Sequence, residues 1–189
     1  MNKRAAIFLD RDDTIIANRE VTAETAHPGD LLDPLLVKLL PGAADAMRLL
    51  ASTGLPFVVI TNQGGIAQGI ATHADVEAVN DRLREILREI SVHLAAVYYS
   101  PNRELRDGPA NAYNGPHSWR KPAPGMLLAA AAELELDLST SWLVGDAPRD
   151  VEAGIRAGLS ADRCLLLSGE FDLWAAAKLI TTSCEQQSL

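Results

Sequence analysis

The chain has 189 residues, 48% of them hydrophobic, and its 17 Lys and Arg against 25 Asp and Glu give a formal net charge of −8. This length suits about one domain that buries a core of ordinary size. The acidic balance disfavours a nucleic-acid partner. No apolar run reaches the roughly 18 residues of a membrane span, and no signal-peptide pattern begins the chain. Its two cysteines, Cys164 and Cys184, give no disulfide or metal-binding framework. We therefore expect a cytoplasmic protein without membrane or nucleic-acid partners; the sequence leaves the oligomeric state open, with a monomer favoured.

Apolar β-type runs alternate with helical patterns along the chain. This alternation predicts βαβ units, and therefore a three-layer α/β fold with a mostly parallel sheet, helices on both faces and no large cap domain. Thr72 and Asp75 have the spacing of a capping box before the clearest helix. The strands are expected at 5–9, 56–61, 95–100, 141–144 and 163–167, and the helices at 42–52, 73–90, 125–135 and 148–157.

Two segments interrupt the alternation. Residues 11–41 are long and irregular, which predicts a flap over the carboxyl ends of the strands, where ligands of such sheets bind. Residues 101–120 are rich in Pro and Gly and predict an extended loop near the substrate; loops of this length in a small domain are usually functional or disordered. No linker divides the chain, so residues 1–189 are expected to form a single domain.

Two carboxylates follow the first predicted strand at once. Asp10 and Asp12 are two residues apart, and in extended backbone such residues point the same way. Acidic groups crowded at a strand end are unfavourable unless a cation or hydrogen bonds compensate them. Because Mg²⁺ takes oxygen ligands and commonly acts on phosphates, the pair indicates a Mg²⁺ site.

Three later strands also end in polar residues. Thr61 and Asn62 lead into a Gly-rich turn whose hydroxyl, amide and backbone N–H groups suit phosphate oxygens. Arg120 and Lys121 follow the third strand and its loop, and two cations there would neutralise a transferring phosphoryl group. Asp146 supplies a further acid after the fourth strand.

The four motifs, at 8–12, 61–69, 120–126 and 144–150, stand in the order of the haloacid dehalogenase-like (HAD) superfamily of phosphohydrolases, which the chain resembles from about 5 to 158. The first three look specifically like those of the histidinol-phosphate and D-glycero-D-manno-heptose-1,7-bisphosphate phosphatases. This resemblance implies a HAD fold and an enzyme that hydrolyses phosphate monoesters.

The resemblance also implies a mechanism. Asp10 would attack phosphorus and form an aspartyl-phosphate, and Asp12 would protonate the leaving oxygen and then activate water. Mg²⁺ would be held by a carboxylate oxygen of Asp10, the backbone carbonyl of Asp12 and the carboxylate of Asp146. Thr61 and Lys121 would bind the phosphoryl oxygens.

Four further residues have secondary parts in this scheme. Asn62 would assist phosphate binding from the turn after Thr61, and Arg120 would contact the phosphate or sugar of the substrate. Asp150 is expected to position Lys121 or to cap the helix that begins near it. Asp13 replaces a frequent Gly, and we expect it to point away and bond to the turn, since Asp tolerates turn conformations.

The loop before the third motif departs from the heptose bisphosphate phosphatases, which often carry a Zn²⁺ site there. The corresponding positions read Ser-Pro-Asn at 100–102 and His-Ser-Trp at 117–119. Ser, Asn and Trp do not replace thiolate and imidazole ligands. We predict no structural zinc, with Tyr113 and Trp119 ordering the loop by packing instead.

The sequence thus predicts a Mg²⁺-dependent phosphatase that acts on a small sugar phosphate, with D-glycero-D-manno-heptose 1,7-bisphosphate as the first hypothesis. Histidinol-phosphate phosphatase is the nearest alternative because it shares the same motifs. A nucleic-acid 3′-phosphatase shares the first two motifs but fits the acidic charge poorly. An inactive binding protein of the same fold is disfavoured by the intact motif residues.

Overall fold

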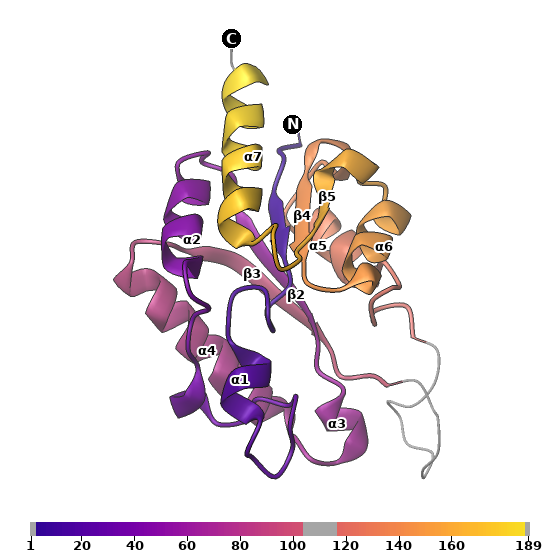
Figure 1. Ribbon diagram of the computed structural model, residues 1–189. Coiled ribbons are helices and arrows are strands. Elements are labelled where there is room, and N and C mark those ends of the chain that lie inside the picture. The colour runs from indigo at the N-terminus through magenta and orange to yellow at the C-terminus, as the bar shows by residue number, and fades with distance from the viewer. Residues whose placement is uncertain (1–2, 104–116, 188–189) are drawn as a thin grey trace.

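The computed structural model describes residues 3–103 and 117–187 (Figure 1). Five strands form one sheet in the order β3-β2-β1-β4-β5, and every neighbouring pair is parallel. The predicted α/β class and all five predicted strands are therefore confirmed. The strands are β1 (Ile7–Leu9), β2 (Phe57–Asn62), β3 (Leu94–Ser100), β4 (Trp142–Gly145) and β5 (Cys164–Leu166).

Helices cover both faces of this sheet. Side chains of α2, α4 and α7 share one hydrophobic core, and those of α5 and α6 share the other, on the opposite face. Among the described residues, no helix is long and apolar enough to cross a membrane. The α-helices are α1 (Asn18–Thr22), α2 (Ala43–Ala51), α3 (Gly65–Gln68), α4 (His73–Glu89), α5 (Gly125–Glu133), α6 (Pro148–Ala157) and α7 (Leu173–Gln187), and the 3-10 helices are η1 (Pro34–Leu36), η2 (Leu138–Thr140) and η3 (Ala161–Arg163).

The strand residues divide between these two cores by simple alternation. Ile7 and Leu9 of β1 pack toward α2, α4 and α7, whereas Phe8 packs toward α5 and α6, and all three are fully buried. A parallel strand buried on both faces needs apolar side chains at consecutive positions. The short apolar runs of the sequence are therefore strands with two covered faces.

The predicted helices lie where the sequence places them, within two residues at each end. The capping box of α4 is present: the Thr72 side chain accepts from the Asp75 N–H, and the Asp75 carboxylate accepts from the Thr72 N–H. Pro148 opens α6 at a position where its missing N–H has no intrahelical partner to lose.

Three of the α-helices in the described residues were not expected, and neither were the 3-10 helices. The segment 11–41, predicted to be irregular, contains α1 and η1, and η1 packs against α4. The short α3 follows the Gly-rich turn after β2, and α7 packs mainly against α2. Figure 1 shows α1 and α3 both toward the end of the molecule opposite the C-terminus. The greater part of the predicted loop 101–120, residues 104–116, lies outside the described residues.

Candidate active site

Two acidic residues leave neighbouring strands at the same edge of the sheet. Leu9 of β1 lies beside Val144 of β4, and the Asp10 N–H donates to the Val144 carbonyl at 3.0 Å. Asp146 follows β4 directly. Because the two strands are parallel, their carboxyl ends coincide, and both acids meet there as the sequence predicts.

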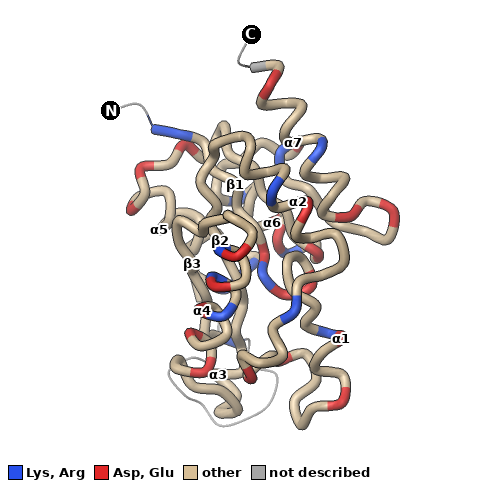
Figure 2. Tube along the Cα trace, turned by 90° about the vertical axis from the view of Figure 1, so that its left-hand side faces the viewer, with Lys and Arg blue, Asp and Glu red and all other residues tan. Residues whose placement is uncertain are grey.

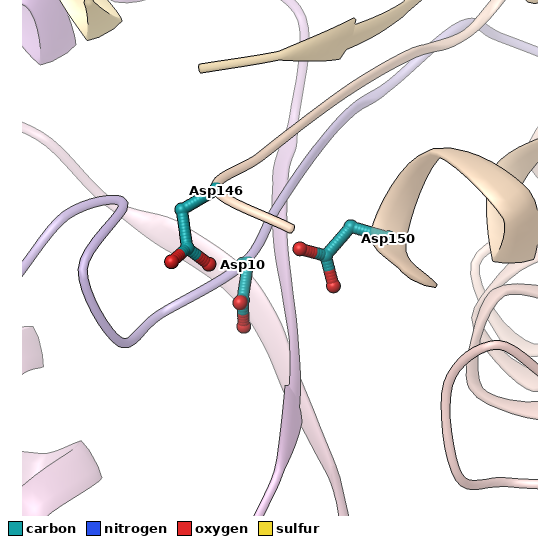
Figure 3. Close-up of side chains that lie close together, drawn as sticks. All are labelled: Asp10, Asp146 and Asp150. Atoms are coloured by element: carbon teal, nitrogen blue, oxygen red, sulfur yellow. The ribbon is translucent and has the colours of Figure 1, made fainter. Parts of the chain in front are cut away.

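Asp10, Asp146 and Asp150 form an acidic cluster at this edge (Figure 3). Each offers a carboxylate oxygen, and the three oxygens lie within 4.8 Å of one another. Oδ1 of Asp146 is buried and has no hydrogen-bond partner among the described residues. A buried carboxylate oxygen without a partner is unfavourable unless a cation satisfies it. This orphaned oxygen beside Asp10 fits a divalent metal that takes oxygen ligands.

Lys121 lies at the centre of the cluster. Its Nζ is 2.8 Å from Oδ1 of Asp10, 2.8 Å from Oδ1 of Asp150 and 2.8 Å from the carbonyl oxygen of Ile60. The side chain is nearly fully buried, so its charge is compensated by these protein oxygens and not by bulk water. The ammonium therefore points at the carboxylate that the sequence names as nucleophile.

Asp150 supports Lys121 and also caps α6. Its Oδ1 pairs with Lys121, while its Oδ2 accepts from the Ala147 N–H at 3.0 Å. Asp150 thus has an ion pair at one oxygen and a hydrogen bond at the other, whereas Asp146 keeps an oxygen without a partner among the described residues. The sequence interpretation offered these two roles as alternatives, and the structure shows both.

Burial dominates the electrostatics of Asp10. Loss of solvent raises the pKa of this carboxyl group to about 7; Lys121 opposes that rise, while the charges of Asp150 and Asp12 add to it. The value describes the protein without metal. A bound divalent cation would favour the ionised form of the same group.

Residues at the carboxyl end of β2 hold the neighbours of Asp10 in place. Asn62 accepts from the Lys121 N–H at 3.0 Å and donates to the Lys121 carbonyl at 3.0 Å, so its amide fixes the main chain that carries the lysine. The Thr61 hydroxyl is buried and lies 3.3 Å from Oδ2 of Asp12. Gln63 donates to the same oxygen at 2.7 Å, a contact that the sequence interpretation did not include.

Arg120 lies beside the turn that follows β2. Its Nη1 donates to the Asn102 carbonyl at 2.6 Å and lies 3.2 Å from the point where a side chain at Gly64 would begin. A residue larger than glycine would therefore press on the guanidinium. Burial raises the pKa of Asp30, and the charge of Arg120 is among the influences that oppose this rise.

Arg19 of α1 reaches over the acidic cluster from the segment 11–41. Its Nη2 is 2.7 Å from Oδ2 of Asp146, and its Nε is 3.2 Å from Oδ2 of Asp13. Asp13 adopts a left-handed conformation with φ of 57° and accepts from the Arg19 N–H at 2.9 Å. Asp13 therefore bonds to the turn, as expected. The sequence interpretation gave Arg19 no role.

Comparison with known proteins identifies the family. A HAD-hydrolase-like family model matches residues 118–183. A D-glycero-beta-D-manno-heptose-1,7-bisphosphate 7-phosphatase of Mesorhizobium japonicum is 42% identical over 82% of this chain and 66% of its own length. The corresponding enzyme of Chlorobaculum tepidum is 38% identical over 84% of this chain and 77% of its own. That of Escherichia coli K12 is 35% identical over 82% and 75%. The chain belongs to the heptose bisphosphate phosphatase family of HAD-like hydrolases.

Solved structures agree with this membership. A putative HAD-like phosphatase from Mesorhizobium loti superposes with a TM-score of 0.79 at 32% identity, covering 98% of this chain and 88% of the other. The D,D-heptose 1,7-bisphosphate phosphatase of B. bronchiseptica, solved with magnesium and phosphate, has a TM-score of 0.73 at 24% identity and covers 95% and 99%. The second likeness establishes a shared fold. The predicted HAD fold of this family member is therefore confirmed.

The region where related phosphatases often carry zinc is only partly described in this family member. Ser100 and Asn102 bond to each other through Oγ and Oδ1 at 3.2 Å. The Trp119 ring packs against Tyr98 with ring centroids 6.2 Å apart, and its predicted role in ordering the loop stays a prediction. Tyr113, the other residue predicted to order it, lies outside the described residues.

Proposed function

We propose that this protein is a Mg²⁺-dependent phosphatase that removes the 7-phosphate from D-glycero-D-manno-heptose 1,7-bisphosphate through an aspartyl-phosphate on Asp10. The observation that carries the proposal is the meeting of Asp10, Lys121 and Asp146 at the carboxyl ends of β1 and β4. The relatives named for this activity, at 35–42% identity, support the choice of substrate.

The residues divide the reaction between them. Asp10 attacks phosphorus, so that its carboxylate oxygen gains the phosphoryl group as the bond to the sugar oxygen breaks. Asp12 gives its proton to that leaving oxygen. In the second half, Asp12 takes a proton from water, the water oxygen bonds to phosphorus, and Asp10 is released with inorganic phosphate.

Positive charge and hydrogen-bond donors of the site bind the phosphate. Lys121 and the Thr61 hydroxyl bind the phosphoryl oxygens, and Asn62 contributes by fixing the lysine main chain. Mg²⁺, held by Asp10 and Asp146 with the Asp12 carbonyl, supplies the positive charge that lets a phosphate dianion approach these carboxylates. Lys121 carries one positive charge and already pairs with two carboxylates. It therefore cannot also compensate the negative charge of the phosphate.

The substrate end of the site is formed by Arg120 and the turn at Gly64 and Gly65. We place the sugar and its second phosphate there, because a guanidinium binds phosphate oxygens through paired N–H donors. Lys, Arg, Asp and Glu are interspersed along the described chain (Figure 2), which suits a small substrate better than a nucleic-acid backbone. We also propose a cytoplasmic location, because a chain with only two cysteines offers no disulfide framework.

Phosphate release from a substrate panel tests the proposal. The panel contains both anomers of the heptose 1,7-bisphosphate, histidinol phosphate and a 3′-phosphorylated oligonucleotide, each with Mg²⁺ and with EDTA. We expect the highest kcat/KM for a heptose bisphosphate, no release in EDTA and none from Asp10→Asn. Asp45→Asn, which changes an exposed carboxylate of α2, should match the parent. Equal release by Asp10→Asn and the parent would overturn the proposal, and a preference for histidinol phosphate would reassign the substrate.

A further inference from the structure

Arg11 is a charged residue that the proposed reaction has not used, and its side chain is fully buried. Two nitrogen atoms of its guanidinium bond to the carboxylate of the neighbouring Asp12: Nε lies 3.1 Å from Oδ1 and Nη2 lies 3.2 Å from Oδ2. The remaining Nη1 donates to Oδ1 of Asn80 at 2.7 Å. Asn80 belongs to α4 and is itself fully buried. The contact therefore ties the carboxylate of Asp12 to a rigid helix.

The pattern of donors makes the two oxygens of Asp12 unequal. Oδ2 receives Nη2 of Arg11 at 3.2 Å and Nε2 of Gln63 at 2.7 Å. Within the described part of the chain, Oδ1 receives only Nε of Arg11. A carboxylate oxygen has about two lone-pair sites, so Oδ1 retains one for a proton and Oδ2 does not.

A buried guanidinium is unfavourable unless its donors are paired, and a core apolar side chain would avoid this penalty. Two-point contact with a carboxylate fixes the orientation of the plane as well as the distance. Asn80 then prevents Arg11 from turning, because it holds the end of the guanidinium that Asp12 does not use. The arrangement orients a group whose proposed task is proton transfer, where small displacements are damaging.

We propose that Arg11, held by Asn80, is a positioning residue that directs Oδ1 of Asp12 toward the oxygen with which it exchanges a proton. In the first step the proton moves from Oδ1 to the leaving sugar oxygen as its bond to phosphorus breaks. In the second step Oδ1 accepts a proton from the attacking water. This inference rests on the proposed function and assigns Arg11 no contact with the substrate.

A comparison of leaving groups tests the proposal. A sugar alkoxide leaves poorly without a proton, whereas p-nitrophenolate leaves readily without one, so only the first substrate depends strongly on the acid. Arg11→Lys keeps the charge but loses the two-point contact. We expect kcat/KM to fall about 10- to 100-fold with the heptose bisphosphate and less than about 3-fold with p-nitrophenyl phosphate. Because kcat/KM covers only the steps up to and including departure of the leaving group, the comparison leaves out hydrolysis of the aspartyl-phosphate.

Both substrates are measured on one preparation, so any unfolded fraction cancels in the ratio. Asn80→Ala should shift the ratio in the same direction, because it removes the acceptor that holds Arg11. Arg84→Lys makes the same exchange at a more accessible arginine of α4, paired with Asp81, and should leave both rates unchanged.

Equal losses with both substrates in Arg11→Lys, or no loss with either, would overturn the proposal. Asp12→Asn separates this failure from that of the proposed function. A shifted ratio in Asp12→Asn without one in Arg11→Lys rejects the role of Arg11 alone. Equal losses in Asp12→Asn reject Asp12 as the acid, and the positioning role with it.

Discussion

Replacing Lys121 by Met should destabilise the fold as well as abolish activity. The side chain is buried, and its Nζ lies 2.8 Å from a carboxylate oxygen of each of Asp10 and Asp150. Met keeps a similar volume but leaves both carboxylates buried without their cation. Removing one partner of a buried ion pair costs about 3–5 kcal/mol. This is a large part of the roughly 5–15 kcal/mol that stabilises a typical domain.

Urea unfolding followed by tryptophan fluorescence in EDTA measures this loss at several pH values. Burial already raises the pKa of Asp10 to about 7, and removing Lys121 removes an influence that lowers it. As the pH falls, such a carboxyl group is protonated at a higher pH in the folded state than in the unfolded state. The ionised group therefore destabilises the folded state at high pH, and this loss of folding free energy fades as the pH falls through the folded pKa. The deficit of Lys121→Met should therefore be largest near about pH 8 and smaller near about pH 5.

A surface lysine provides the control. Lys38 pairs with Glu20 at 2.9 Å where both side chains are more than half exposed, and Lys38→Met should change the free energy of unfolding by less than about 1 kcal/mol. A Lys121→Met protein as stable as the parent would show that Lys121 does not stabilise the buried carboxylates, and an equal deficit at both pH values would show that Asp10 does not cause the loss.

Three further predictions concern single contacts. Arg19→Gln removes the guanidinium that pairs with Oδ2 of Asp146, so Mg²⁺ should bind the protein about 2- to 5-fold more tightly in calorimetry; unchanged or weaker binding contradicts this. Gly154→Ala places a Cβ 2.7 Å from the Cys164 sulfur and 3.2 Å from Leu143, so it should destabilise the fold by about 1–3 kcal/mol despite a better helix propensity; a higher urea midpoint would show that the contact relaxes. Burial raises the pKa of the Cys164 thiol to about 11, so iodoacetamide should label it about 100-fold more slowly near pH 8 in the folded protein than in urea, and equal rates would show that the thiol is accessible.

The strands could be predicted because the apolar residues that their burial requires are consecutive in the sequence. Each is a short apolar run between polar turns, and a strand covered on both faces needs nothing more. The helix α7 was not predicted, although Leu173, Ala176, Ala177 and Ile180 bury one of its faces at helical spacing. Polar residues of low helix propensity follow at 181–183, and packing against α2 outweighs them.

The candidate site could be predicted to the extent that it depends on strand ends. Parallel neighbours end together, so Asp10 and Asp146 meet by topology. Arg11 and Arg19 were missed because side-chain direction decides their contacts. Arg11 meets Asn80 across 69 positions of sequence, which local patterns do not report.

One signal of the Arg11 contact was nevertheless present in the sequence. Asn80 lies four residues after Val76 and three before Leu83, on the apolar face of the predicted helix 73–90. A polar amide on such a face needs a hydrogen-bond partner when it is buried. The sequence indicates that a partner exists, and only the fold identifies it as Arg11.

Trapping the covalent intermediate shows whether Asp10 is the nucleophile. Borohydride added to the protein during turnover of the heptose bisphosphate with Mg²⁺ reduces an aspartyl-phosphate to homoserine, and peptide mass spectrometry locates the change. We expect homoserine at position 10 with substrate and Mg²⁺ together, and unmodified Asp10 when either is left out. Turnover with Asp10 unmodified, or homoserine at another position, would contradict it.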